Sequence, residues 1–143
     1  TPTLESRDWA KASYCEKAAE MAYKMAGIKQ PINEIDFAEI DDTFSYKELQ
    51  HLAAMKLGCE CEMGTWIDTG VTQLNGEFPV NPSGGSLGMG HLLDASGLAR
   101  VYMAVKQLRS EAGTLQVKNA NTALVQGWRG LPTTSGAVAI LSN

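Results

Sequence analysis

Apolar residues recur at helical spacing in three segments of the chain, which we expect to fold as amphipathic helices. The first covers residues 8–26, with Asp8 as its N-cap and Gly27 as its stop. A second helix is predicted over residues 46–57 and a third over about residues 95–112. The apolar stripe of the first helix consists of Trp9, Ala12, Cys15, Ala19, Ala22 and Ala26.

The other two helices are expected to pack through one apolar side each. On the second helix His51 falls off that side, so a surface histidine is predicted there. The apolar side of the second helix carries Leu49, Leu52, Ala53 and Lys56. The third helix ends before Gly113, and its predicted apolar face is formed by Leu98, Val101, Tyr102, Val105 and Leu108.

Shorter apolar patterns predict the strands. Residues 32–41 alternate apolar and acidic side chains and indicate a strand that ends at Asp41 and Asp42. Residues 122–128 and 136–142 are typical of short buried strands, joined by the sequence RGLPTT. The order helix, strand, helix, loop, helix, strand, strand predicts an α/β fold, with a mixed sheet covered by helices, as one domain over residues 1–143.

Composition narrows the classes of partner. Apolar residues make up 44% and charged residues 20% of the 143 positions, as in ordinary globular proteins, and the net charge is −4. With lysine and arginine scattered, we expect neither a nucleic-acid partner nor an anionic membrane surface. No apolar run approaches the roughly 20 residues that span a bilayer. Three cysteines without framework spacing predict a reducing, cytoplasmic location.

The glycine-rich segment at residues 81–97 is the main candidate for chemistry. Gly85 and Gly90 have Walker spacing, but His91 and Leu92 stand where lysine and serine or threonine belong. The dinucleotide fingerprint also fails. Glycines allow a ligand to approach the backbone, and a histidine before a helix is suited to hold a developing oxyanion or to move a proton. The alternative is a histidine that only caps or packs the turn.

The cysteines are not expected to be reactive or metal-binding. Cys59 and Cys61 supply at most half of a tetrahedral site, so no metal is predicted and the two are expected to form a reduced pair. Cys15 lies on the buried stripe of the first helix and is expected to be an inert packed thiol.

Three segments together resemble the C-terminal half of thiolases, most of all the sterol-carrier-protein and archaeal-type branch. They are EIDDTFSYKELQ, NPSGGSLGMGHLLDASGLAR and LVQGWRGLPTTSGAVAIL. With the preceding helix and strand, the resemblance covers nearly the whole chain. It implies a thiolase-like C-terminal half and the function of an acyl-CoA C-acyltransferase, which cleaves 3-oxoacyl-CoA by thiolysis or forms it by Claisen condensation.

The resemblance also implies roles for single positions. His91 matches the catalytic histidine of the family, which binds the thioester oxygen and stabilises the enolate. Asp41 stands where the family carries an asparagine or histidine partner of that histidine, and it completes the predicted catalytic pair. The positions expected to contact the acyl-CoA are Ser83, Gly84, Gly85, Gly90, Trp128 and Gly130.

The departures from the family concern proton transfer. Leu92 and Asp94 replace the proline and glycine that follow the family's histidine. Thr43 replaces the acid/base cysteine, and the tryptophan loop lacks it too. A threonine hydroxyl cannot replace a thiolate as the acid/base catalyst at neutral pH. The carboxylate of Asp41 would repel an enolate unless it keeps His91 protonated.

The resemblance implies several partners. The nucleophilic cysteine of thiolases belongs to their N-terminal half, and none of this chain's cysteines matches it, so the chain alone is expected to be inactive. A homodimer and, as in some relatives, a small zinc-ribbon OB-fold protein are further implied partners. Coenzyme A enters as part of the substrate, and no cofactor is expected.

The sequence is compatible with three functions. The first is the acyltransferase just described. The second is a retro-aldolase acting on CoA-linked side chains, with Tyr46, Tyr102 or Asp41 as the base. The third is a non-catalytic subunit that binds acyl-CoA or acts as a scaffold.

Overall fold

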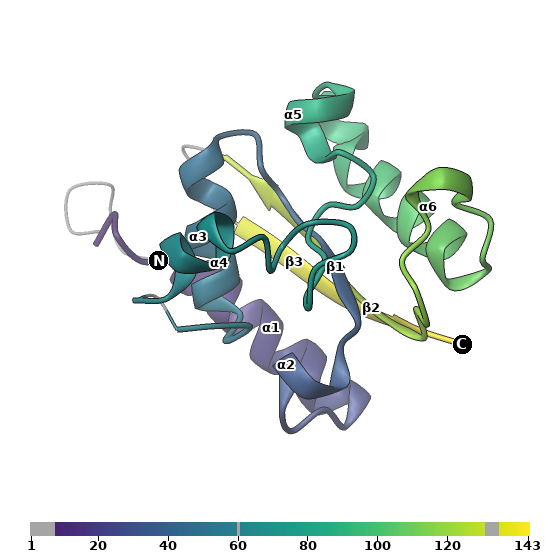
Figure 1. Cartoon of the computed structure of the whole chain (residues 1–143). Helices are drawn as coiled ribbons and strands as arrows, with labels where there is room; N and C mark the ends of the chain where they lie inside the picture. The colour runs from purple at the N-terminus through teal and green to yellow at the C-terminus, as the bar shows by residue number, and fades with distance from the viewer. Residues whose placement is uncertain (1–7, 60, 131–134) are drawn as a thin grey trace.

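A three-stranded sheet lies between two helical layers in the computed structural model, which describes residues 8–59, 61–130 and 135–143 (Figure 1). Strand β1 (Phe37–Glu39) runs parallel to β2 (Thr122–Arg129). Strand β2 pairs antiparallel with β3 (Ser135–Ser142) along its whole length, in the order β1-β2-β3. The predicted α/β fold with a mixed sheet is confirmed, and the link between the last two strands lies partly outside the described residues.

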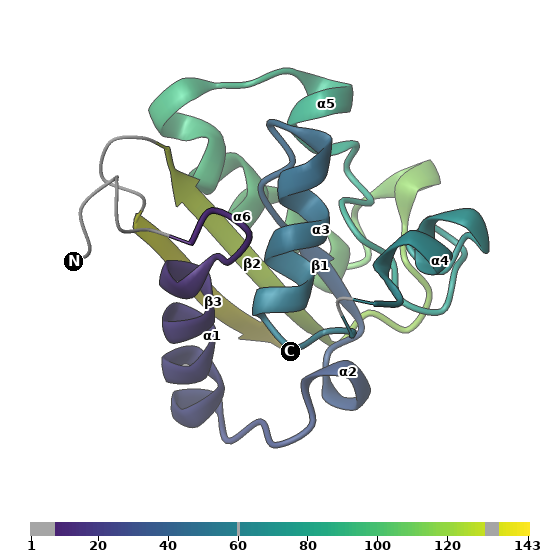
Figure 2. The same ribbon diagram turned by 90° about the vertical axis from the view of Figure 1, so that its left-hand side faces the viewer.

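The two faces of the sheet are covered by different helices. Helices α1 (Ser13–Ala26) and α3 (Ser45–Ala54) lie in front of the sheet in Figure 2, and α6 (Ser96–Leu108) lies behind it. Successive strand residues alternate between two cores: Ala38 and Leu124 join the core under α1 and α3. Their neighbours Phe37, Ala123 and Val125 join the core under α6. Both faces of β1 and of the middle of β2 are buried, which fits their apolar runs. The edge strand β3 has no buried residue, so the strand over residues 136–142 is present as predicted but its predicted burial is wrong.

Helix α1 is shorter than predicted. It begins at Ser13, because Asp8 instead accepts a hydrogen bond from the backbone N–H of Ala10 through Oδ1 and closes an earlier turn. Its predicted end is confirmed: Gly27 has φ 75° and caps the helix in the left-handed region. Cys15 is fully buried, as predicted, and burial raises its pKa to about 12.

Most of the strand predicted over residues 32–41 is wrong. Residues Pro31–Glu34 form the one-turn helix α2, with proline at its start. One carboxylate oxygen of Glu34 accepts hydrogen bonds from the backbone N–H groups of Lys29 and Gln30, which fixes this turn. The strand is therefore reduced to the three residues of β1. Asp41 and Asp42 follow it, as predicted.

Helix α6 buries only part of the predicted face: Leu108 is buried and Val101 packs against the core, as predicted. Leu98 and Tyr102 are 74% and 60% exposed, whereas Arg100, Ala104 and Gln107 are buried. Arg100 and Gln107 can be buried because the polar atoms of each side chain have buried partners. Gln107 donates to the carbonyl of Leu115 and accepts from the N–H of Val117, while Arg100 forms an ion pair described below.

Short helices fill the rest of the chain: α4 (Met63–Asp68), α5 (Gly85–Met89), η1 (Leu93–Ala95) and η2 (Gly113–Leu115). Cys59 and Cys61 are joined by a disulfide bond, so the predicted reduced pair is wrong. No helix in the described part of the chain is long and apolar enough to cross a membrane.

Candidate active site

A cleft of about 1120 Å³ lies where the carboxyl ends of β1 and β2 meet. Ligands commonly bind outside the carboxyl ends of parallel strands, because the chain there leaves the sheet in loops. The walls come from the start of α1, the turn after β1, the start of α3, the segment from His91 into α6, and the facing ends of β2 and β3.

The structure brings only some of the predicted site residues to this cleft. His91, Trp128 and Gly130 line it, together with Thr43 and Arg100. Asp41 is not part of the described lining, but its side chain is paired with Arg100, which is. The predicted substrate-binding residues Ser83, Gly84, Gly85 and Gly90 do not belong to its described lining.

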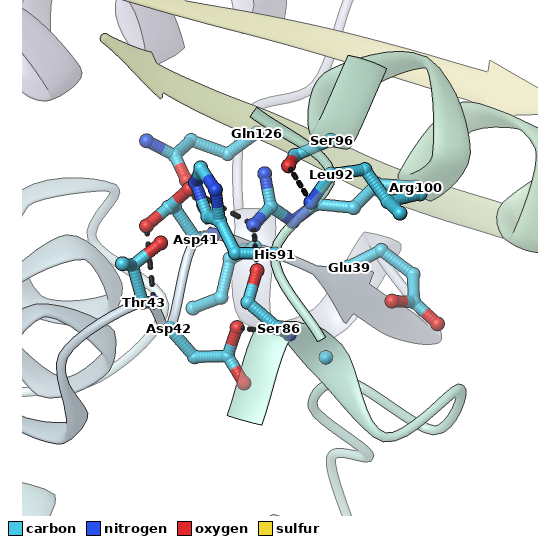
Figure 3. A network of polar contacts seen from close by, with 12 residues as sticks. Glu39, Asp41, Asp42, Thr43, Ser86, His91, Leu92, Ser96, Arg100 and Gln126 are labelled. Carbon is cyan, nitrogen blue, oxygen red and sulfur yellow. Dashed lines mark hydrogen bonds and ion pairs between the residues drawn. The ribbon is translucent and has the colours of Figure 1, made fainter. Parts of the chain in front are cut away.

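Asp41 forms a buried ion pair with Arg100 (Figure 3). The distance from Oδ2 of Asp41 to Nη2 of Arg100 is 2.9 Å, and the two side chains are 2% and 4% exposed. The same Nη2 donates to Oγ of Ser86 at 2.7 Å. Between Asp41 and His91, both among the described residues, there is no hydrogen bond or ion pair. The guanidinium of Arg100, rather than the imidazole of His91, therefore balances the charge of Asp41.

The glycines of the loop bring α5 against Asp42. Oδ1 of Asp42 accepts from the N–H of Ser86 at 2.6 Å, and Oδ2 accepts from the N–H of Leu87 at 3.3 Å. Gly85 has φ 59°, and a Cβ there would overlap the carboxylate of Asp42. Gly84 is likewise left-handed, with φ 101°. These glycines support the loop that leads to His91.

Ser83 fixes the other end of this loop to the sheet. Its N–H and its hydroxyl donate to the two carboxylate oxygens of Glu39, at 3.0 and 2.7 Å. Both residues are buried. Ser83 is thus engaged with β1, away from the described lining of the cleft.

His91 presents a hydrogen-bond donor. Its side chain is exposed and lines the cleft, and Nδ1 accepts a hydrogen bond from the N–H of Leu93 at 3.1 Å. Because Nδ1 is the acceptor, the proton of the neutral ring lies on Nε2. Nε2–H is therefore able to donate to an oxygen of a bound ligand.

His51 is a buried residue that the helical pattern missed, and it contacts Tyr14 and Trp128 of the cleft lining. The prediction of a surface histidine is wrong: the side chain is 0% exposed and lies between α1 and the sheet. Nδ1 lies 3.1 Å from the carbonyl oxygen of Asp41, and Nε2 lies 3.0 Å from the hydroxyl of Tyr14. Burial lowers the pKa of His51 to about 4. No motif in the sequence marks His51, because its burial depends on its contacts with Tyr14 and with the carbonyl of Asp41.

Three buried polar atoms have no hydrogen-bond partner among the described residues. They are Oγ1 of Thr43, Nε2 of Gln126 and Nε1 of Trp128. Thr43 and Trp128 line the cleft, although their unpaired atoms are themselves buried. Within the described ranges, no three or more His, Cys, Asp or Glu side chains come together in a way that could hold a metal ion.

Glu39 and His51 are expected to make opposite contributions to stability as pH changes. Burial raises the pKa of Glu39 from 4.5 to about 7, so its contribution is complete below pH 4.5 and is lost as pH rises towards 7. The lowered pKa of His51 gives a contribution that is lost as pH falls from 6.5 to about 4. Over the shared range the two oppose each other.

Replacing Glu39 with glutamine should expose the contribution of His51. The unfolding free energy of Glu39→Gln, relative to that of the original protein, is expected to rise by about 3 kcal/mol between pH 4.5 and 7. Urea unfolding at several pH values measures this difference. Glu77→Gln is the matched control, because Glu77 is exposed. A difference independent of pH for Glu39→Gln would contradict the assignment.

Comparison with known proteins identifies the family. A profile of the family described as thiolase C-terminal domain-like matches residues 2–143. The chain belongs to this family, which confirms the resemblance drawn from its glycine–histidine segment and strand ends.

Individual relatives agree. Acetyl-CoA acetyltransferase of Methanothermobacter thermautotrophicus is 37% identical over 138 residues, which are 95% of this chain and 34% of that protein. Human sterol carrier protein 2 is 39% identical over 109 residues, covering 76% of this chain and 20% of that protein. Benzoylsuccinyl-CoA thiolase subunit BbsB of Thauera aromatica is 30% identical over 112 residues, covering 78% and 29%. The chain spans about a third or less of the length of these relatives.

A solved structure shares the fold. The Ltp2-ChsH2(DUF35) aldolase superposes with a TM-score of 0.74 over 90% of this chain and 31% of that chain. Its sequence identity is 23%. This similarity supports the fold.

Proposed function

We propose that the chain is the C-terminal domain of a thiolase-like acyl-CoA C-acyltransferase, which thiolytically cleaves or condenses 3-oxoacyl-CoA. The observation that carries the proposal is the position of His91, whose Nε2–H is free to donate within a cleft at the strand ends. Membership of the thiolase C-terminal domain-like family supports the choice of substrate class.

His91 would act on the thioester oxygen. When the bond between C2 and C3 of a 3-oxoacyl-CoA breaks, its electron pair enters the thioester and the oxygen becomes an enolate. A positioned donor stabilises this charge more than it stabilises the neutral carbonyl, which lowers the barrier. Because Arg100 is paired with Asp41, the carboxylate of Asp41 does not oppose the enolate with an unbalanced charge.

Cationic side chains would favour the coenzyme A part of the substrate. Lys11 and Arg129 are exposed and, with Lys47, line the cleft. Positive charge at the mouth of a cleft attracts phosphate groups over distances beyond direct contact. This supports acyl-CoA as the ligand, with coenzyme A as part of the substrate. That the domain needs no further cofactor stays a prediction.

The reaction requires a nucleophile from elsewhere. We propose that an N-terminal thiolase half supplies the cysteine, since the relatives are about three times as long as this chain or longer. Leu93, Leu98 and Tyr102 are exposed apolar side chains that such a half could cover. The homodimer, the zinc-ribbon OB-fold partner and the cytoplasmic location stay predictions.

The test is the activity of His91→Ala in the complete protein. Loss of one oxyanion donor is expected to lower kcat for thiolysis of a 3-oxoacyl-CoA by about 100- to 1000-fold. Stability should change little, because His91 is exposed. Leu92→Ala, at the exposed neighbouring position, is the control and should retain full activity. Equal rates for His91→Ala and the original protein would refute the proposed role.

A retro-aldolase is the second candidate, and Thr43 favours it. Its hydroxyl is buried and unpaired in the cleft, at the position where the resemblance places a cysteine. No cysteine belongs to the described lining. Offering the complete protein a 3-hydroxyacyl-CoA and a 3-oxoacyl-CoA separates the two candidates: cleavage of the 3-oxoacyl-CoA alone would exclude the retro-aldolase.

A further inference from the structure

The ring of Tyr14 is held in a fixed position at the cleft. It stacks on Trp128 with ring centroids 6.5 Å apart and an interplanar angle of 19°. Trp128 on β2 faces Gly136 on β3. A Cβ at Gly136 would lie 3.1 Å from Cδ2 of Tyr14, so the absence of a side chain there lets the ring approach the sheet. Tyr14 is half-buried and lines the cleft.

The hydroxyl of Tyr14 donates its hydrogen bond to His51. A backbone carbonyl can only accept, so Nδ1–H of His51 must donate to the oxygen of Asp41. Nε2 then carries the lone pair and accepts from Tyr14 at 3.0 Å. Burial lowers the pKa of His51 to about 4, so the ring is a neutral acceptor at neutral pH.

A positive charge lies close to the same ring. Nζ of Lys47 is 6.0 Å from the ring centroid of Tyr14 and 4.8 Å from that of Trp128. A nearby cation favours negative charge that develops on the phenol oxygen. Lys47 is buried, so water screens this interaction less than at an open surface.

Several other groups near the cleft differ from Tyr14 in exposure or chemistry, and the carboxylate of Asp94 in the lining is exposed to solvent. Tyr46 is 60% exposed and stacks on Phe44. Lys11 is exposed, and Thr43 has an ordinary hydroxyl. The thiol of Cys15 is outside the lining, and burial raises its pKa. Tyr14 differs because its hydroxyl donates a hydrogen bond to the buried imidazole of His51.

We propose that Tyr14 is the catalytic acid/base of the cleft and that His51 is the positioning residue that accepts its proton. This inference rests on the proposed function, because it names the proton-transfer group for acyl-CoA chemistry. The substrate group that loses the proton is the 3-hydroxyl in retro-aldol cleavage and the coenzyme A thiol in thiolysis.

The proton balance is complete for cleavage of a 3-hydroxyacyl-CoA. The hydroxyl proton moves to the oxygen of Tyr14 as the proton of Tyr14 moves to Nε2 of His51. The oxygen forms a carbonyl at C3, the C2–C3 bond breaks, and its electron pair becomes the enolate at His91. Tyr14 then gives a proton to C2 and recovers its own from His51. Because the pKa of His51 is lowered, its ring is a weak base that holds the proton only while the C2–C3 bond breaks and then returns it to Tyr14.

The test compares Tyr14→Phe, His51→Asn and Tyr23→Phe in the complete protein. Tyr14→Phe keeps the ring and is expected to lower kcat about 100-fold with KM changed less than about threefold. His51→Asn keeps a donor for the carbonyl of Asp41 but removes the acceptor. It should move the rising limb of the kcat–pH profile to higher pH, which a purely structural role would not do. Tyr23, on the same helix, donates to the carbonyl of Met55 outside the cleft lining, so Tyr23→Phe should keep full kcat.

The outcomes separate this inference from the proposed function. Loss of activity in His91→Ala together with full activity in Tyr14→Phe would overturn the role of Tyr14 and leave the proposed function standing. No turnover of acyl-CoA by the original protein would overturn the proposed function. Labelling with 4-(2-aminoethyl)benzenesulfonyl fluoride then decides on Tyr14, since an activated phenol displaces fluoride to form a sulfonate ester. Preferential labelling of Tyr14 that His51→Asn abolishes would support its activation, and labelling no faster than at Tyr46 would overturn it.

Discussion

Replacing Arg100 with methionine is expected to lower the free energy of unfolding by about 3–5 kcal/mol, because the substitution leaves the carboxylate of Asp41 buried without its counter-charge. The hydrogen bond to Ser86 is lost as well. Methionine keeps much of the side-chain volume, so the loss reports the charge rather than a cavity. Urea unfolding followed by circular dichroism measures it.

Two further variants make the Arg100 experiment specific. Arg129→Met replaces an exposed arginine and should change the unfolding free energy by less than about 0.5 kcal/mol. The double variant Asp41→Asn with Arg100→Met removes both charges, and it should recover part of the lost stability. If the double variant were as unstable as the sum of the two single variants, the ion pair would not be the cause.

Replacing Gly85 with alanine should have an effect of similar size for a different reason. The left-handed backbone at φ 59° disfavours a Cβ by about 1–2 kcal/mol. The Cβ would also displace the carboxylate of Asp42, whose hydrogen bonds to the backbone of Ser86 and Leu87 are each worth about 1.5–3 kcal/mol. We expect a total loss of about 3 kcal/mol or more, measured by thermal or urea unfolding.

Gly88 provides the control on the same helix. A Cβ at Gly88 would meet nothing within 4 Å, and this residue does not have positive φ. Gly88→Ala should therefore be neutral or should stabilise the protein by up to about 1 kcal/mol. A comparable loss in both variants would mean that the contact with Asp42 does not explain the effect at Gly85.

The features that the sequence predicted correctly depend on neighbouring residues. The left-handed cap at Gly27 follows from the end of one apolar stripe, and the burial of Cys15 follows from its place on that stripe. The two last strands were also predicted from their apolar runs, although only β2 has buried residues and β3 is a partly exposed edge strand.

The features that the sequence missed depend on partners far along the chain. Arg100 is buried because Asp41 lies 59 positions before it, and no helical period reports that pairing. His51 can be buried because the hydroxyl of Tyr14, 37 positions earlier, forms a hydrogen bond with its Nε2. Sequence periodicity treats arginine and histidine as polar surface residues, and only the tertiary contact reverses that assignment.

The candidate site follows the same division. His91 was found because glycines frame it and the thiolase resemblance marks it, and the structure places it at the cleft. Asp41 was found for its position after a strand, but its partner was not. Tyr14 and His51 carried no motif, and only the packing of α1 against α3 brings them together.

The pairing of β1 with β2 has a consequence for the order in which the chain folds. A carboxylate oxygen of Asp36 accepts from the N–H of Thr122, 86 positions later, so the sheet closes a long loop. Loop closure over such a separation is slow compared with helix formation. During synthesis on the ribosome, the apolar sides of α1 and α3 would therefore stay exposed to solvent until β2 and β3 have been synthesised. For that interval this exposure favours the association of both helices with other apolar surfaces.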